Sequence, residues 1–166
     1  MSDRLSSAFQ RTRDEGRAAL VPFVTVGYPS VEATLKIIPA LEAAGADVIE
    51  LGVPFSDPLA EGPTIQKSSH HALEQGVSSE TAMAVARDLR NAGVSAPMVF
   101  MGYYNPILSY GIERYCKDAA EAGIDGLIVP DLPAEENAEL KALTGKYGLS
   151  LIPLVALTSP GRRVEE

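Results

Sequence analysis

Short apolar runs alternate with amphipathic segments along almost the whole chain. The runs are apolar on both faces, which is typical of strands buried in a parallel sheet. The expected strands are residues 18–26, 48–53, 97–101, 127–129 and 149–157.

Between these runs, apolar residues recur at helical spacing, so the pattern predicts a helix after each strand. Ser30 is placed to cap the second helix through its hydroxyl, and Gly45 is placed to end it. Ser159 and Pro160 are typical of the cap and first turn of one more helix. The expected helices lie around residues 5–9, between 30 and 45, over 64–73, from 78 through 89, around 112–119 and over 134–147.

Strands alternating with helices predict an α/β fold, with a parallel sheet covered by helices. The chain also repeats a helix stop before a strand, because Ala-Gly-Ala-Asp at 44–47 is echoed by Ala-Gly-Ile-Asp at 122–125. Similar repeated units are what a barrel would produce. The pattern alone leaves both a barrel and an open doubly wound sheet possible.

Composition narrows the class of protein. The chain has 166 residues, of which 46% are hydrophobic, and this length suits a single domain with a core. A net charge of −8 disfavours binding to nucleic acid or to an anionic membrane surface. We find no stretch of membrane-spanning length and no signal-peptide core, so a cytoplasmic protein is expected.

Three residues that often carry chemistry are expected to be structural. Adjacent residues on a helix diverge, so His70 and His71 are expected to be surface or packing residues rather than ligands of one metal ion. Cys116 is the single cysteine, so it forms no internal disulfide. It falls on an apolar helix face and is expected to be a packed thiol.

The most informative residue is Glu50, a carboxylate inside an otherwise apolar strand. Loss of hydration there would raise its pKa and make it a candidate proton donor. The alternative is a buried Glu that backbone donors or a basic side chain satisfy.

The long loop after this strand adds Asp57 and Glu61. Ser56, Asp57 and Pro58 favour an Asx-type turn, and Glu61 could equally be a solvated loop charge. Long loops between short connections are often functional, however. Two carboxylates converging on one pocket would suit a reaction that adds one proton and removes another.

Four motifs resemble tryptophan synthase alpha subunits, in that family's order and spacing. They are PFVTVGYP at 22–29, ELGVPFSDPLAEGPTIQ at 50–66, MGYYNP at 101–106 and VPDLP at 129–133. The resemblance implies a (β/α)8 TIM barrel. It also implies a lyase of tryptophan biosynthesis, which cleaves indole-3-glycerol phosphate to indole and glyceraldehyde 3-phosphate by a retro-aldol reaction.

The same resemblance assigns roles to residues. It implies that Glu50 is the catalytic carboxylate that moves protons at indole C3 and at the glyceryl hydroxyl. It places Glu61 where the family has the carboxylate facing the indole nitrogen, although the family usually has Asp there. It also places Phe23 and Tyr103 in the indole pocket, whereas composition alone would make both of them ordinary core residues.

The resemblance further implies a partner, the tryptophan synthase beta subunit, in an alpha2beta2 assembly. The expected interface residues are Asp57, Pro58, Tyr104, Asn105 and Asp131. From local chemistry alone, Asp131 would instead cap the helix that follows it. Pyridoxal phosphate is expected only in the beta subunit, so no metal or cofactor is expected here.

A (β/α)8 barrel needs about 250 residues, and this sequence supplies five of its eight strands. We therefore expect residues 1–166 to be a partial βα-barrel domain. The phosphate-binding loops after strands seven and eight of such barrels are not in the sequence, so weak or no catalysis is expected of these residues alone.

Two alternatives compete with the lyase. The chain could be a non-catalytic module that binds or activates the beta subunit. It could also be another phosphosugar-handling barrel, such as an indole-glycerol-phosphate synthase or a phosphoribosyl isomerase. The Pro-Phe-Ser-Asp-Pro-Leu stretch at 54–59 disfavours this last alternative.

Overall fold

A parallel sheet forms the centre of the computed structural model, which describes residues 3–159 and residue 161. The strands pair in the order β1-β2-β3-β4-β5, and each neighbouring pair is parallel. This confirms the predicted parallel α/β fold. Doubly wound sheets reverse their strand order, so an unreversed order favours a barrel. The strands are β1 (Phe23–Thr25), β2 (Ile49–Gly52), β3 (Met98–Met101), β4 (Gly126–Ile128) and β5 (Ser150–Ile152).

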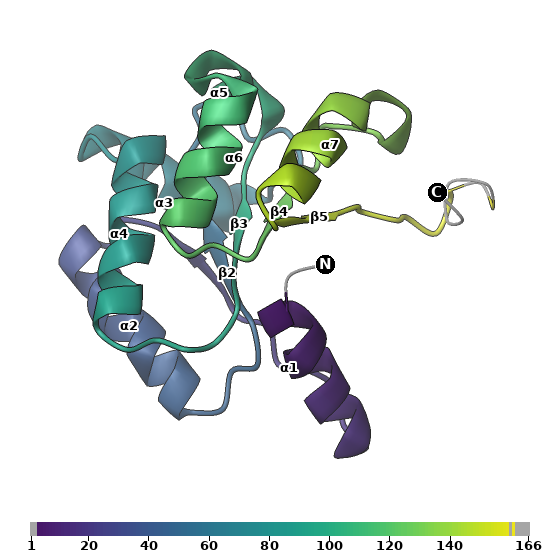
Figure 1. The fold of residues 1–166 in the computed structure, drawn as a ribbon. Coiled ribbons are helices and arrows are strands. Elements are labelled where there is room, and N and C mark those ends of the chain that lie inside the picture. The colour runs from purple at the N-terminus through teal and green to yellow at the C-terminus, as the bar shows by residue number, and fades with distance from the viewer. Residues whose placement is uncertain (1–2, 160, 162–166) are drawn as a thin grey trace.

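Helices α2, α4, α6 and α7 lie along one side of the sheet, whereas α1 lies apart from them (Figure 1). The cap at Ser30 is confirmed, since its hydroxyl accepts the N–H of Ala33 at 3.1 Å. Gly45 ends α2 with a φ of +101°. The helices are α1 (Asp3–Asp14), α2 (Val31–Ala43), α3 (Pro63–Glu74), α4 (Ser79–Asn91), α5 (Tyr104–Tyr110), α6 (Ile112–Glu121), the 3-10 turn η1 (Ala134–Glu136) and α7 (Ala138–Lys146).

The two faces of the sheet pack differently because side chains alternate along a strand. On the outer face, residues such as Leu51 and Phe100 join the main core beneath the helices. On the inner face, Val48 and Val99 pack against Leu5 of α1 in a second cluster. In residues 3–159 and 161, the crossover helices pack on the outer face, so side chains of the inner face meet α1 and one another.

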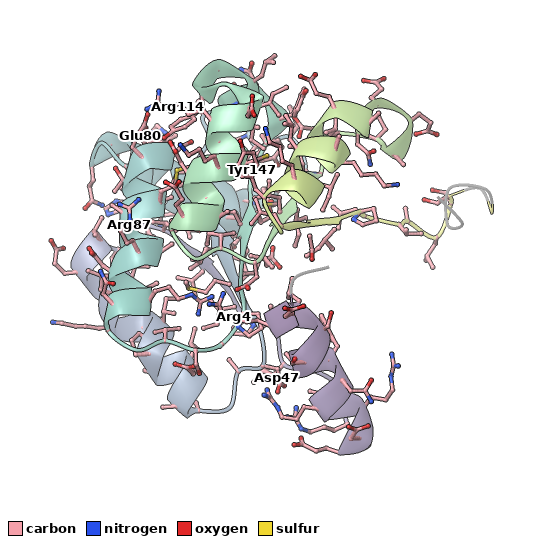
Figure 2. The ribbon with its side chains drawn as sticks, viewed as in Figure 1. Arg4, Asp47, Glu80, Arg87, Arg114 and Tyr147 are labelled. Carbon is pink, nitrogen blue, oxygen red and sulfur yellow. The ribbon has the colours of Figure 1, made fainter. Side chains whose placement is uncertain are left out.

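The repeated Ala-Gly-x-Asp motif has a structural role at the amino ends of the strands. The buried carboxylate of Asp47 accepts hydrogen bonds from Arg17, at 2.6 and 2.8 Å, from Arg11 and from the backbone N–H of Leu20. Figure 2 shows Asp47 beside α1. Each repeat therefore ends a helix with a glycine and then uses a carboxylate to fix the start of a strand.

Asp47 should make folding sensitive to acid. The hydrogen bonds from Arg17, and then from the N–H of Leu20, hold the pKa of Asp47 well below its usual range. A depressed folded-state pKa contributes stability above the unfolded-state pKa, near 4, and this contribution is lost as the pH falls. Asp47→Asn should therefore lower the urea midpoint at pH 7, and the difference from the wild type should shrink below about pH 4. A difference that is constant with pH would contradict this assignment.

Some predicted boundaries were wrong. The strand predicted at 18–26 is paired as β1 only at 23–25, because Pro22 has no N–H to donate to the ladder. The strand predicted at 149–157 ends at Ile152, directly before Pro153. The helix predicted over 134–147 is interrupted at Asn137. Of the helix expected at Ser159 and Pro160, residues 160 and 162–166 lie outside the described residues.

One helix was missed by the sequence pattern, and the predicted lack of a membrane-spanning segment can be checked against the helices. Helix α5 was not predicted at all. In the part of the chain that the structure describes, no helix is long and apolar enough to cross a bilayer.

Candidate active site

Strand β2 places Glu50 on the inner face of the sheet. Its register partners are Phe23 on β1 and Val99 on β3, and Val99 belongs to the inner cluster. The side chain is half-buried, and none of the described residues gives it a hydrogen bond or an ion pair. Glu50 is therefore not a carboxylate locked to a basic partner beneath the helices.

The surroundings of Glu50 favour its neutral form. Burial raises the pKa of its carboxyl group, and the negative charge of Glu61 raises it further. Burial also raises the pKa of Glu61. A raised pKa makes each group a better proton carrier near neutral pH than an exposed glutamate. The structure thus brings together the two carboxylates that the sequence singled out.

The loop between β2 and α3 is held in place by hydrogen bonds at three points. At its start, the Ser69 hydroxyl accepts the N–H of Phe55 at 2.9 Å and donates to the Phe55 carbonyl at 3.1 Å. In its middle, the Ala60 N–H donates to the Tyr103 hydroxyl at 2.9 Å. At its end, the Gln66 side chain donates to the Glu61 carbonyl at 2.9 Å. These contacts hold the backbone of the loop that carries Glu61.

Phe23, Glu61 and Tyr103 line one cleft at the carboxyl ends of the strands, and its cavity volume is only about 10 Å³. Gly52 makes room for the Phe23 ring, because a Cβ atom at Gly52 would lie 2.4 Å from that ring. The cleft is smaller than the ~300 Å³ at which small-molecule sites begin. Glu50 does not line it but neighbours Phe23 across the β1–β2 ladder.

A larger cavity lies at the opposite, amino-terminal end of the sheet, where Arg4, Arg11 and Arg17 line it. These arginines already bind buried carboxylates: Arg4 pairs with Asp125, and the other two pair with Asp47. We therefore assign this cavity a structural role. Glu50 and Glu61, the carboxylates whose pKa values are raised, lie at the other end, where βα-barrels carry their chemistry.

The residues predicted for a partner interface all follow the carboxyl ends of strands. Asp57 and Pro58 lie in the loop after β2, Tyr104 and Asn105 lie at the start of α5, and Asp131 follows β4. Asp57, Asn105 and Asp131 are exposed.

Two local predictions about these loops were wrong. Asp131 does not cap the helix that follows it; its carboxylate accepts the N–H of Tyr104, at 2.9 and 3.2 Å, and so caps the earlier helix α5. The Asx turn is not formed either. The Asp57 carboxylate accepts the Ser56 hydroxyl at 2.6 Å, and the Leu59 N–H donates to the backbone carbonyl of Asp57.

His70 and His71 make contacts at the protein surface, and Cys116 is packed in the core. His70 pairs with Glu74 at 3.3 Å, and His71 contacts the Pro29 carbonyl. Cys116 is fully buried, and burial raises the pKa of its thiol to about 11. Within residues 3–159 and 161, no three His, Cys, Asp or Glu side chains are grouped so that they could hold a metal ion.

Comparison with known proteins identifies the family. Residues 9–166 match the family described as tryptophan synthase alpha chain. The chain belongs to this family. It is 50% identical to the tryptophan synthase alpha chain of Chloroflexus aggregans over 164 residues, which are 99% of this chain and 61% of that relative.

Solved structures of tryptophan synthase alpha chains agree with this assignment. The alpha subunit from Legionella pneumophila superposes with a TM-score of 0.95 at 36% identity, covering 99% of this chain and 63% of that one. An aminoacrylate-bound tryptophan synthase from M. tuberculosis gives 0.91 at 39% identity, covering 97% of this chain and 65% of that one. The present chain thus spans about three fifths of the length of its curated relatives. The barrel prediction is confirmed for the five parallel strands and the helices described between them, and the other phosphosugar barrels lose their support.

Proposed function

We propose that this tryptophan synthase alpha chain, at the full length of its relatives, is a lyase of tryptophan biosynthesis. Its reaction would be the retro-aldol cleavage of indole-3-glycerol phosphate to indole and glyceraldehyde 3-phosphate. The observation that carries the proposal is the pair Glu50 and Glu61. Both are half-buried, burial raises the pKa of both, and the charge of Glu61 raises the pKa of Glu50 further.

The reaction needs two such groups. The bond between indole C3 and the glyceryl carbon breaks, and its electron pair returns to the ring. C3 gains a proton, while the hydroxyl on the glyceryl carbon loses one as it becomes the aldehyde. Glu50 would deliver the first proton and accept the second, so that no net proton is consumed. Glu61 would face the indole N1–H and share its proton as charge moves into the ring.

The residues that line the cleft would form the walls of the indole-binding site. Phe23 and Tyr103 would contact its faces, since both line the cleft with Glu61. We propose no metal or cofactor for these steps, because proton transfer alone completes them. Residues of the loop after β2 line this small cleft, so the loop would have to move for the substrate to bind.

We further propose a partner, the tryptophan synthase beta subunit, in an alpha2beta2 assembly. The exposed residues Asp57, Asn105 and Asp131, together with Pro58 and Tyr104, would form the contact surface at the carboxyl ends of the strands. Pyridoxal phosphate would reside in the beta subunit. We infer a cytoplasmic location from the biosynthetic role of the family and from the free thiol of Cys116.

Indole release by the full-length polypeptide, with and without the beta subunit, tests the proposal. We expect release from indole-3-glycerol phosphate by the alpha chain alone and faster release with the beta subunit. A chain that releases no indole in either condition, yet changes the activity of the beta subunit, would be a non-catalytic module. That result would overturn the lyase proposal.

A further inference from the structure

The backbone just before Glu61 is held by Tyr103, the residue that precedes helix α5. The N–H of Ala60 donates to the hydroxyl oxygen of Tyr103 at 2.9 Å. Tyr103 is only 4% exposed, and its ring packs against that of Phe55 with 5.3 Å between ring centroids. A buried ring with two such contacts has little freedom, so the Tyr103 oxygen is a fixed point for the loop.

The position of Tyr103 is in turn fixed by Asp131, which lies in the loop after β4. Tyr103 is the residue preceding α5, and the first helical residue is Tyr104. Tyr104 donates its N–H to both carboxylate oxygens of Asp131. Tyr103 has no side-chain cap of its own, so Asp131 supplies the acceptor and the negative charge that this helix start favours.

We propose that Tyr103 and Asp131 are positioning residues that set Glu61 opposite Glu50. Asp131 fixes the start of α5, the start of α5 fixes the Tyr103 hydroxyl, and the hydroxyl fixes the backbone at Ala60, next to Glu61. The loops after β2, β3 and β4 are thereby connected through two hydrogen-bonding contacts. The catalytic consequence rests on the proposed function, whereas the positioning itself does not.

The test uses the full-length chain and four variants. Tyr103→Phe removes the acceptor for the Ala60 N–H but keeps the ring. Asp131→Ala removes the cap of α5, and Asp131→Asn keeps one acceptor oxygen. Tyr110→Phe is the matched control, because Tyr110 ends the same helix and its hydroxyl donates instead to Asp118, at 2.7 Å.

Three quantities are measured for each variant: the hydrogen exchange rate of the Ala60 amide, the titration of the Glu50 carboxyl carbon by NMR, and the kcat and KM of indole release. Tyr103→Phe should speed Ala60 exchange by about tenfold, the loss expected for one hydrogen bond. It should also lower the pKa of Glu50, because a loosened Glu61 spends less time nearby. Asp131→Ala should also speed Ala60 exchange and lower the pKa of Glu50, but to a smaller extent. In Asp131→Asn, both quantities should lie between those of Asp131→Ala and the wild type.

The kinetic readout separates positioning from simple packing. Asp131 does not line the cleft, so Asp131→Ala should lower kcat several-fold with an unchanged KM. Tyr110→Phe should leave Ala60 exchange, the Glu50 pKa and kcat at wild-type values.

The results for Tyr103, for Asp131 and for the wild type test separate parts of the proposal. Unchanged Ala60 exchange and Glu50 titration in Tyr103→Phe would overturn the positioning role. An effect of Tyr103→Phe without any effect of Asp131→Ala would remove Asp131 from it. If the wild type releases no indole but both NMR readouts respond as described, the positioning stands and the lyase proposal fails.

Discussion

Replacing Glu50 by Gln in the full-length chain should reduce indole release by at least about a hundredfold, because general acid–base groups contribute roughly 10²–10⁴-fold to rates. The amide has nearly the shape of the carboxylic acid, but it neither gives up nor accepts a proton near neutral pH. Since burial and the charge of Glu61 both raise the pKa of Glu50, the wild-type residue is poised for this exchange. The measurement is kcat for indole release at saturating indole-3-glycerol phosphate.

The same substitution should not weaken the fold. A carboxyl group whose folded-state pKa is raised stabilises the protein most below its unfolded-state pKa, and this contribution is lost as the pH rises through the folded-state value. A neutral amide at position 50 is not subject to that loss. Glu50→Gln should therefore match the wild type in urea midpoint near pH 4 and equal or exceed it at pH 7.

A suitable control is Glu121→Gln, which alters an exposed glutamate near the end of α6. This variant should keep wild-type turnover. Turnover of Glu50→Gln within a few-fold of the wild type would remove Glu50 from the mechanism. A large loss of stability would instead show that its carboxylate has a structural partner.

The sequence predicted the half-buried position of Glu50 in a strand because the signal for it is local. A carboxylate in an apolar strand stands out from its neighbours, and the alternation of side chains then assigns it to one face. The helices were predicted for the same reason. The periodicity of α2 and the capping hydroxyl of Ser30 both lie within a few residues of the element they specify.

What the sequence did not predict depends on contacts between distant residues. Helix α5 has only seven residues and contains Pro106, and its cap comes from Asp131, 27 residues beyond Tyr104. A pattern search assigns Asp131 to the nearest helix start, which is the wrong one. The hydroxyl of Tyr103 likewise acts on a loop 43 residues earlier, so composition made it an ordinary core residue.

The partners of the two carboxylates in the Ala-Gly-x-Asp repeat were also missed, because they are distant in the sequence. The repeat was recognised as a helix stop before a strand, but the arginines that bind Asp47 and Asp125 come from other segments of the chain. Only the fold reveals that these aspartates join α1 to the amino ends of the strands. This makes them the points at which stability should be most sensitive to substitution.

Asp125→Ala should destabilise the protein by about 3–5 kcal/mol, the cost of removing one partner from a buried ion pair. The Asp125 side chain is 2% exposed and accepts from Arg90 at 2.7 Å, from Arg4 at 3.1 Å and from the backbone N–H of Met98 at 3.0 Å. Met98 is the first residue of β3, so the carboxylate connects two helices to the start of a central strand.

Most of this loss of stability is expected from Arg90, because its side chain is only 14% exposed. Burial lowers the pKa of its guanidinium, and the charge of Asp125 opposes that shift. Without the carboxylate, the guanidinium stays charged and keeps only carbonyl acceptors, those of Gly123, Val94 and Ala96. The charge of Glu42 still acts on Arg90, but the carboxylate that binds the guanidinium directly is gone.

Urea unfolding of the full-length chain measures the effect, with Asp14→Ala as the matched control. Asp14 is an exposed carboxylate on α1 that accepts one hydrogen bond, from Gln10 at 2.7 Å, so its removal should change the free energy of unfolding by less than about 0.5 kcal/mol. Replacing Arg90 by Met together with Asp125→Ala should recover part of the loss, because no buried charge would then be left alone. If Asp125→Ala behaves like Asp14→Ala, the carboxylate does not stabilise the amino ends of the strands, and the role we assign to the repeat is wrong.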